Sequence, residues 1–165
     1  MELLLVRHAI AAERDASQWP DDGKRPLTHQ GEERMRKAAR GLHRIVAEVD
    51  LMLSSPLVRA WQTAEILRDE IGWPEPKEWS DLEPDRSPAA TVRSLKPLAE
   101  ANRVVLVGHE PNLSEVASYL LTGDDGGVEI VMKKAGVACL GIDGVPGPKA
   151  AWLSWLATPR MLRLI

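Results

Sequence analysis

The chain has 165 residues, of which 44% are hydrophobic and 27% charged, a composition typical of soluble globular proteins. This length predicts a single domain over residues 1–165 and argues against disordered, collagen-like and coiled-coil structures. A net charge of −3 argues against nonspecific nucleic-acid binding, which needs a concentrated basic face.

A single cysteine, Cys139, excludes an intrachain disulfide and a zinc site built from several cysteines, and we expect it in the core. The opening apolar run, residues 3–6, is too short for a signal peptide, and no stretch reaches the length of a membrane span. We therefore expect a cytoplasmic protein, most simply a monomer, that binds neither nucleic acid nor membranes.

Strands are predicted where short apolar runs are bounded by charged or turn residues. These runs are residues 2–6, 50–53, 103–107, 137–142 and 151–157. The last two are joined by Asp143-Gly-Val-Pro-Gly-Pro148, a turn sequence that predicts an antiparallel pair.

Helices are predicted between the strands, because apolar residues recur there at spacings of three and four. The four helical patterns follow Thr28, Ser55-Pro56, Ser87-Pro88 and Pro111. Serine followed by proline favours a helix start, so we expect Ser55 and Ser87 to be N-caps. The alternation predicts a three-layer α/β sandwich, with helices on both faces of a mostly parallel central sheet that has an antiparallel C-terminal strand. The remaining long segments, residues 10–27 and 72–88, are predicted loops.

Histidines and arginines stand at the ends of the predicted parallel strands. Arg7 and His8 follow the first strand, His109 follows Gly108 after the third, and Arg59 enters the helix that follows the second. Ligands of such sheets bind at the carboxyl ends of the strands. We expect these two histidines and two arginines to converge there, joined by Arg25 from the loop that returns across the same edge.

Each of these residues also has a simpler interpretation when it is taken alone. A histidine at a strand end is often only a hydrogen-bonding residue. Arg59 in a first helical turn is unfavourable for the helix dipole unless an anion compensates it, and otherwise it extends into solvent. Phosphate is such an anion, because backbone donors and the dipole both favour it. The convergence, more than any one residue, favours a phosphate site.

Three segments resemble, in order, the signatures of the histidine phosphatase superfamily. They are Leu3-Leu-Leu-Val-Arg-His-Ala9, Ser54-Ser-Pro-Leu-Val-Arg-Ala-Trp-Gln-Thr-Ala64 and Val107-Gly-His-Glu-Pro-Asn112. The resemblance extends over essentially the whole chain and implies a phosphoglycerate mutase-like fold. The short chain, Ala9 where many members have glycine, and Arg25-Pro-Leu-Thr-x-x-Gly31 make it most similar to the SixA-type phosphohistidine phosphatases.

The resemblance implies that His8 is the phosphorylated nucleophile and that Arg7, Arg59 and His109 bind the transferring phosphoryl oxygens. It implies a further phosphate contact at Arg25, and neither a metal nor an organic cofactor. Phosphoryl transfer needs mainly positioning and charge stabilisation, which the planar donor forks of arginine supply. A neutral His8 attacks in line if its other ring nitrogen donates to a backbone carbonyl. A cationic His109 would add charge and donors.

A general acid is predicted less directly. Asp81-Leu-Glu-Pro-Asp85 places carboxylates after the second helix, and Asp81 and Glu83 are the candidates. The alternative is that all three are solvated loop charges. A phosphohistidine substrate needs little acid, because its imidazole leaves as a neutral ring when the distal nitrogen is already protonated.

We therefore expect a phosphatase for phosphohistidine on a protein, such as a His-containing phosphotransfer domain or a phosphocarrier. The alternative is a small-molecule phosphomonoesterase that uses the same site with Glu83 or Asp81 as its acid. A phosphate-binding module without catalysis would not need a nucleophile such as His8. A mutase would need a lid that retains its intermediate, and the short chain leaves little room for one.

Overall fold

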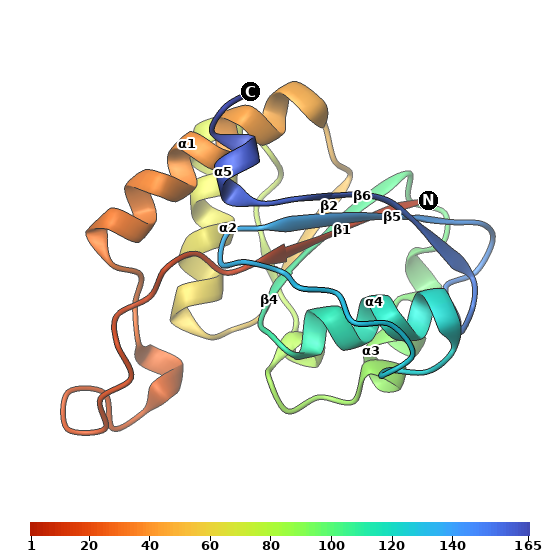
Figure 1. Cartoon of the computed structure of the whole chain (residues 1–165), viewed down its shortest axis with the longest axis horizontal. Helices are drawn as coiled ribbons and strands as arrows, with labels where there is room; N and C mark the ends of the chain where they lie inside the picture. Colours follow the sequence, from red (N-terminus) through yellow and green to blue (C-terminus); the bar gives the residue numbers. More distant parts are fainter.

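The computed structural model describes residues 1–165 and contains a six-stranded sheet between two layers of helices (Figure 1). The strands are β1 (Glu2–Arg7), β2 (Leu51–Ser54), β3 (Lys77–Glu78), β4 (Arg103–Gly108), β5 (Val137–Ile142) and β6 (Ala151–Ala157). Their order across the sheet is β3-β2-β4-β1-β5-β6. The first four are parallel, whereas β5 is antiparallel to both β1 and β6. This confirms the predicted mixed sheet, and β5 is its antiparallel strand.

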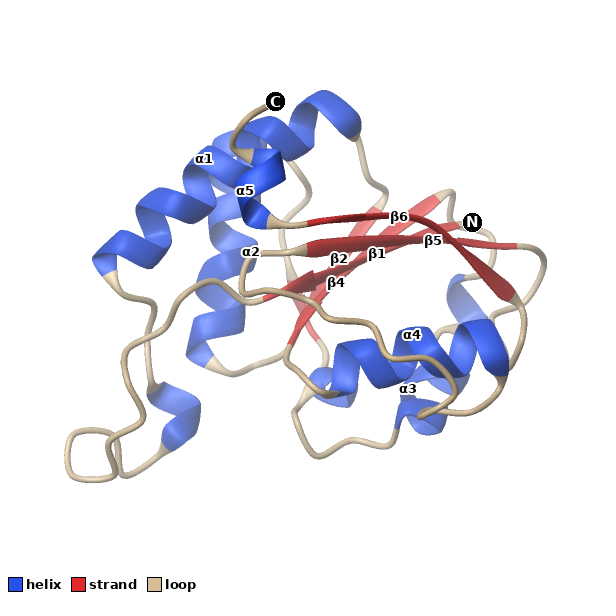
Figure 2. Ribbon diagram, viewed as in Figure 1, coloured by secondary structure: helices blue, strands red, loops and turns tan.

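Helices cover both faces of the sheet (Figure 2). They are α1 (His29–Ile45), α2 (Val58–Ile71), α3 (Pro88–Ser94), α4 (Asn112–Thr122) and the short α5 (Pro159–Leu162). The helices α1, α2 and α5 pack on one face, and α3 and α4 pack on the other. None of the helices is both long enough and apolar enough to span a membrane.

The alternation of side chains along β1 explains why the core has two halves. Leu4 and Val6 point into the cluster under α1 and α2, whereas Leu3 and Leu5 point into the cluster under α3 and α4. All four are fully buried. Such continuous apolar runs are typical of strands that are covered on both faces. Cys139 is also buried, as predicted.

Three local predictions need correction. The predicted loop 72–88 contains the two-residue strand β3, which pairs with β2 at the edge of the sheet. The apolar pattern after Thr28 continues beyond the end of α1, because Val46 and Val49 enter the core from the connecting loop. Ser55 is not the N-cap of α2; that position is Leu57, and Ser55 contacts His109 instead.

The carboxyl ends of β1, β2 and β4 lie side by side and are extended by backbone hydrogen bonds. The His8 N–H donates to Gly108 O at 3.0 Å, and the Ser55 N–H donates to Val107 O at 3.0 Å. These bonds hold the first residues after each strand at one edge of the sheet. That edge is where the sequence predicted the site.

Candidate active site

His8 is fixed by its ring at the end of β1. Its Nδ1 lies 2.7 Å from Ala9 O, so Nδ1 carries a proton and the lone pair is on Nε2. The side chain is buried, and burial lowers the His8 pKa from 6.5 to about 3, with Arg59, Arg7 and Lys134 contributing in the same direction. The ring is therefore neutral at physiological pH, and Nε2 is available as a nucleophile.

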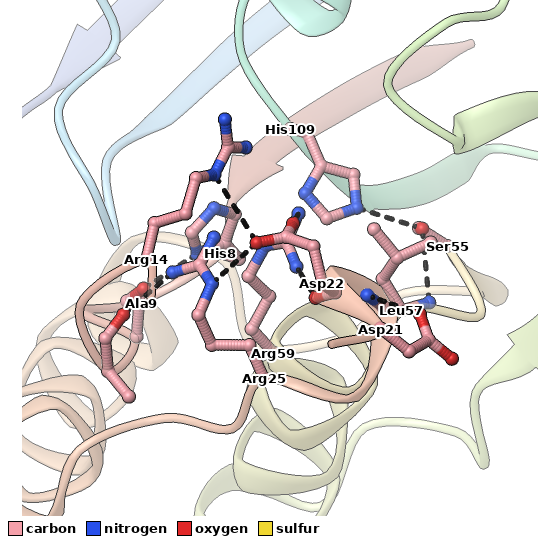
Figure 3. A network of polar contacts seen from close by, with 12 residues as sticks. His8, Ala9, Arg14, Asp21, Asp22, Arg25, Ser55, Leu57, Arg59 and His109 are labelled. Atoms are coloured by element: carbon pink, nitrogen blue, oxygen red, sulfur yellow. Dashed lines mark hydrogen bonds and ion pairs between the residues drawn. The ribbon is translucent and has the colours of Figure 1, made fainter. Parts of the chain in front are cut away.

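His109 faces His8 at the end of β4. The two ring centroids are 5.2 Å apart, so both rings border one small volume. His109 Nε2 lies 2.9 Å from Ser55 Oγ, and that oxygen already accepts the Leu57 N–H (Figure 3). When the buried Ser55 hydroxyl donates to Nε2, Nδ1 carries the ring proton and is free to donate to a ligand.

His109 is neutral in the protein without a ligand, whereas the predicted positive charge concerns the transition state and stays a prediction. Burial lowers the His109 pKa from 6.5 to about 3, and the neighbouring His8 and Arg59 lower it further. A buried imidazole that is surrounded by other cations and basic rings is stable only in its neutral form. In this state His109 offers one N–H donor without a charge.

Arg59 and Arg25 reach the same place from α2 and from the loop before α1. Arg59 is the second residue of α2, and its side chain is only 4% exposed. Arg25 is also buried, and its Nη1 donates to Ala12 O at 2.7 Å. The fork of each arginine thus points along the carboxyl edge rather than into solvent, which rules out the solvent-exposed interpretation of Arg59.

An aspartate joins the arginines. Asp22 lies 2.9 Å from Arg25 Nε and 3.2 Å from Arg59 Nη2, and Arg14 approaches it to 3.3 Å (Figure 3). The hydrogen bond from Arg25 lowers the Asp22 pKa, and the charges of Arg59 and Arg14 act in the same direction. A carboxylate thus binds to the arginine group in the protein alone. This shows that the group accepts an oxyanion.

Arg7 binds the loop beside the nucleophile. Its Nη1 donates to Met132 O at 2.7 Å, and its Nε is buried without a partner in the protein. Arg59 Nε and His109 Nδ1 are likewise buried without partners. Buried donors are nearly always satisfied, so three such nitrogens at one edge fit a ligand that is rich in acceptors, such as a phosphoryl group.

Thr63 locks α2 to the segment that carries His8. Its Oγ1 accepts the Ala9 N–H at 3.0 Å and donates to Arg59 O at 2.7 Å, and the side chain is fully buried. Because one hydroxyl contacts the residues beside the nucleophile and the helical arginine, it sets their relative position. This is a positioning role.

The motif from Arg25 to Gly31 anchors the start of α1 against the residues after His8. Thr28 caps the helix, accepting the Gly31 N–H at 2.9 Å and donating to Ile10 O at 3.3 Å. A Cβ on Gly31 would lie 2.1 Å from Ile10 O, so only glycine permits this approach.

The predicted acids lie outside this group of contacts. Asp81 stands in the 3₁₀ turn 80–82, and its backbone oxygen accepts from Thr91 Oγ1. Glu83 makes a long 3.5 Å contact with Arg86. No hydrogen bond or ion pair joins either carboxylate to Arg7, His8, Arg59 or His109, so a role as general acid stays a prediction.

Three residues of the site were missed by the sequence analysis, namely Asp22, Ser55 and Thr63. Asp22 stands three residues before Arg25, a spacing that permits an ion pair but is common on surfaces. Ser55 was interpreted as a helix cap. Thr63 occupies an ordinary helical position, and only the packing of α2 against β1 gives it a function.

Other parts of the molecule offer no competing site of this kind. A hollow of about 430 Å³ lies at the opposite, amino-terminal edge of the sheet, beside Met1, Gly141 and Trp152, and contains none of the predicted residues. The chain has no group of three or more His, Cys, Asp or Glu side chains arranged to hold a metal ion. The carboxyl edge remains the place where buried ionisable groups gather.

Comparisons with known proteins indicate the family of the chain. A family model, Histidine phosphatase superfamily (branch 1), matches residues 3–83. A protein of Picosynechococcus sp. that is described as uncharacterized is 40% identical over 139 residues, which are 83% of this chain and 82% of that protein. The phosphohistidine phosphatase SixA of Escherichia coli is 28% identical over 130 residues, which are 75% and 76% of the two chains.

Solved structures share the fold over nearly the full length. The protein histidine phosphatase SixA in complex with tungstate superposes with a TM-score of 0.84 at 24% identity, over 97% of this chain and 98% of that chain. A mycobacterial glucosyl-3-phosphoglycerate phosphatase with inorganic phosphate gives 0.72 at 17% identity, over 96% and 98%. With its signature residues gathered at the carboxyl edge of such a sheet, the chain belongs to the histidine phosphatase superfamily and has the fold of SixA-type proteins.

Proposed function

We propose that the protein is a phosphatase that removes the phosphoryl group from phosphohistidine on a protein, through a covalent intermediate on His8. The observation that carries this proposal is the state of His8: neutral, held through Nδ1 by Ala9 O, and adjacent to His109 and Arg59. The similarity to a phosphohistidine phosphatase of Escherichia coli supports the choice of substrate.

In the first step, the His8 Nε2 lone pair forms a bond to phosphorus while the bond between phosphorus and the substrate nitrogen breaks. The electron pair of that bond returns to the substrate imidazole, which leaves neutral when its other nitrogen carries a proton. Arg7 and Arg59 bind the equatorial oxygens, and their fixed charges stabilise the transition state. Arg25 contacts the same group after the phosphoryl displaces the carboxylate of Asp22.

In the second step, a water oxygen attacks phosphorus and the bond to His8 Nε2 breaks, with its electrons returning to Nε2. The water protons stay with orthophosphate or pass to solvent, and His8 is restored to its starting tautomer. The His109 Nδ1–H donates a hydrogen bond to a phosphoryl oxygen and keeps its proton, while the contact with Ser55 holds the ring from the other side. Neither step needs a proton donor for the leaving group, which agrees with the lack of contact between Asp81 or Glu83 and the site.

The test is a comparison of wild type and His8→Ala on a phosphohistidine-containing phosphotransfer protein and on common phosphoesters. We expect wild type to turn over phosphohistidine and to accumulate an acid-labile phosphoryl group, and His8→Ala to do neither. His29→Ala is the matched control, because His29 is exposed at the start of α1 and contacts only Glu33. It should behave as wild type.

The phosphomonoesterase alternative makes the opposite prediction. An alkoxide leaving group needs a proton, so kcat on a phosphoester would depend on Glu83 or Asp81. Preferential turnover of a sugar phosphate, lost in Glu83→Gln, would replace phosphohistidine as the substrate. Failure to trap any phosphoryl group on His8 with either substrate class would overturn the covalent mechanism.

A further inference from the structure

A second hollow lies beside the nucleophile segment, and its charged residues make none of the hydrogen bonds or ion pairs described above. It has a volume of about 300 Å³ and is lined by residues of α1, α5 and the loop that precedes β5. Ala9 and Ile10, the two residues that follow His8, form part of its wall. The hollow therefore adjoins the segment that carries His8.

The hollow is lined by positive charge from three separate parts of the chain. Its cationic residues are Arg34, Lys133, Lys134, Arg160 and Arg163. No acidic residue is part of its wall, and none of the five forms an ion pair within the protein. On a chain with a net charge of −3, five unpaired cations around one hollow are a local reversal of the overall charge.

The loop that carries Lys133 and Lys134 is hydrogen-bonded to the backbone of the nucleophile segment. The Ala135 N–H donates to both Arg7 O and His8 O at 3.1 Å, with Ala135 in the left-handed region at φ 61°. A non-glycine residue rarely adopts this conformation, and such conformations cluster at functional sites. These hydrogen bonds place Lys134 close enough for its charge to contribute to the lowered pKa of His8.

We propose that this hollow is a second anion-binding subsite, which receives a carboxylate or phosphate group of the substrate next to the phosphoryl group that is transferred. The inference rests on the proposed function, because it assigns a substrate preference to the same enzyme. The subsite selects phosphohistidine that is flanked by acidic side chains on a protein, or a small phosphate ester that carries a second anionic group.

The physical basis is selective stabilisation at short range. Ala9 in the wall of the hollow directly follows His8, and the cations of the hollow act on anions within about one Debye length, about 8 Å at physiological salt. Exposed cations give little binding energy singly, whereas several that face one anion act together. A neutral group beside the phosphoryl group gains nothing from these cations. The subsite should therefore raise kcat/KM for a substrate with a second anion relative to one without it.

The experiment uses two phosphohistidine peptides that differ only in having Glu or Gln at the positions that flank phosphohistidine. Wild type should prefer the Glu peptide by about tenfold in kcat/KM at low salt, since a few weak ion pairs sum to that factor. The Arg34→Gln/Arg160→Gln variant should reduce this ratio severalfold. Both residues are exposed, so we expect the variant to fold as wild type does.

Lys96→Gln is the matched control, because Lys96 is exposed on the opposite face of the sheet and lines none of these hollows. It should keep the wild-type ratio. A second pair of substrates, a sugar bisphosphate and the corresponding monophosphate, separates the two sources of the anion. A charge preference with the peptides alone assigns the subsite to acidic protein substrates, and one with the sugars alone assigns it to small molecules.

Equal ratios in wild type, Arg34→Gln/Arg160→Gln and Lys96→Gln for both pairs would overturn the subsite while leaving the phosphatase intact. Absence of phosphohistidine turnover in wild type would instead overturn the proposed function. In that case calorimetry still tests the subsite: the affinities of the same four compounds are measured for His8→Ala, with and without the two arginine substitutions. Unchanged relative affinities there would also reject it.

Discussion

The helix α2 carries two arginines in opposite environments. Arg59, in the first turn, is buried at the end of the helix where the dipole disfavours a cation. Burial lowers its pKa, and Arg25 and Arg14 lower it further against the effect of Asp22. Arg68, in the last turn, stands where the dipole favours it, and hydrogen bonds to Asp69 and Glu75 raise its pKa.

This contrast separates a structural arginine from a functional one. Arg68 lies where the helix dipole favours a cation and pairs with two exposed carboxylates, so its own surroundings explain its position. Arg59 opposes the dipole, loses hydration and lies near other cations, and its partner Asp22 is partly exposed. A residue held against these local costs is typical of a site whose stabilising partner is a ligand.

The largest expected effect tests this contrast directly. Arg59→Gln should lower kcat/KM by about 10²–10³-fold, because one preorganised donor to the transferring group is lost. Arg68→Gln, on the same helix, should leave kcat/KM unchanged. Steady-state kinetics on a phosphohistidine peptide, with thermal unfolding to confirm folding, checks both variants. Equal effects of the two substitutions would refute the division into functional and structural arginines.

Acid should lower the free energy of unfolding, because His8 and His109 are buried as neutral rings. Both His8 and His109 have pKa values near 3 in the folded protein and 6.5 when unfolded. Below pH 6.5 the unfolded chain therefore binds protons that the folded state does not bind. Titration of the two histidines should leave the free energy of unfolding unchanged above pH 6.5 and lower it progressively between pH 6.5 and about 3.

Urea unfolding at pH 7, 5.5 and 4.5 measures this loss. The double variant His8→Gln/His109→Gln retains the carboxylates of the wild type but lacks these two bases, so its stability should decline less over the same window. The same slope in both proteins would mean that the two imidazoles titrate at ordinary pKa values.

Thr63→Val tests the link between α2 and the nucleophile segment. The substitution leaves the buried Ala9 N–H without its acceptor, which should cost about 1–3 kcal/mol of stability and lower kcat as His8 loses its fixed position. Thr122→Val, at the end of α4, removes a hydroxyl that makes similar local bonds and should leave kcat unchanged. Chemical unfolding and kinetics separate the two effects.

Asp22→Asn tests whether the carboxylate competes with phosphate for the arginines. We expect inorganic phosphate to inhibit the variant about threefold to tenfold more strongly, because a charged competitor has been removed. Asp69→Asn, which loses only an exposed pair with Arg68, should not change the inhibition constant. Weaker inhibition of Asp22→Asn would show that Asp22 instead holds the arginines in their binding positions.

The smallest effect is predicted for the stability of Arg68→Gln. Its ion pairs are exposed, and such pairs contribute little, so the Tm should change by no more than about 2 °C. Differential scanning calorimetry at low and high salt measures the change. A clearly larger shift would mean that the C-terminal end of α2 is more important for folding than its surface position indicates.

Features with a local sequence signal were predicted correctly. The apolar run of β1 and the spacing of three and four in α1 and α2 predicted a covered parallel sheet, because burial on one or both faces fixes the period of apolar residues. Position at a strand end then predicted His8 and His109 at one edge. The turn after Ile142 predicted the antiparallel pairing of β5 with β6.

Features decided by tertiary contact were not predicted. Ser55 had the local signal of a helix cap, yet its hydroxyl orients His109, and the burial that makes His109 neutral exists only in the folded chain. Asp22 and Thr63 acquire their roles from α2 lying against β1 and the loop before α1.

Short-range periodicity and strand direction are properties of the amino-acid sequence alone, and they were enough to predict the order of the elements and the reactive side chains at the carboxyl edge. The folded chain was needed to find three further properties, namely the protonation state of the two histidines, the binding of Asp22 by the arginines and the basic hollow beside the His8 segment. Those properties depend on burial and on charges from distant segments, which no local pattern records.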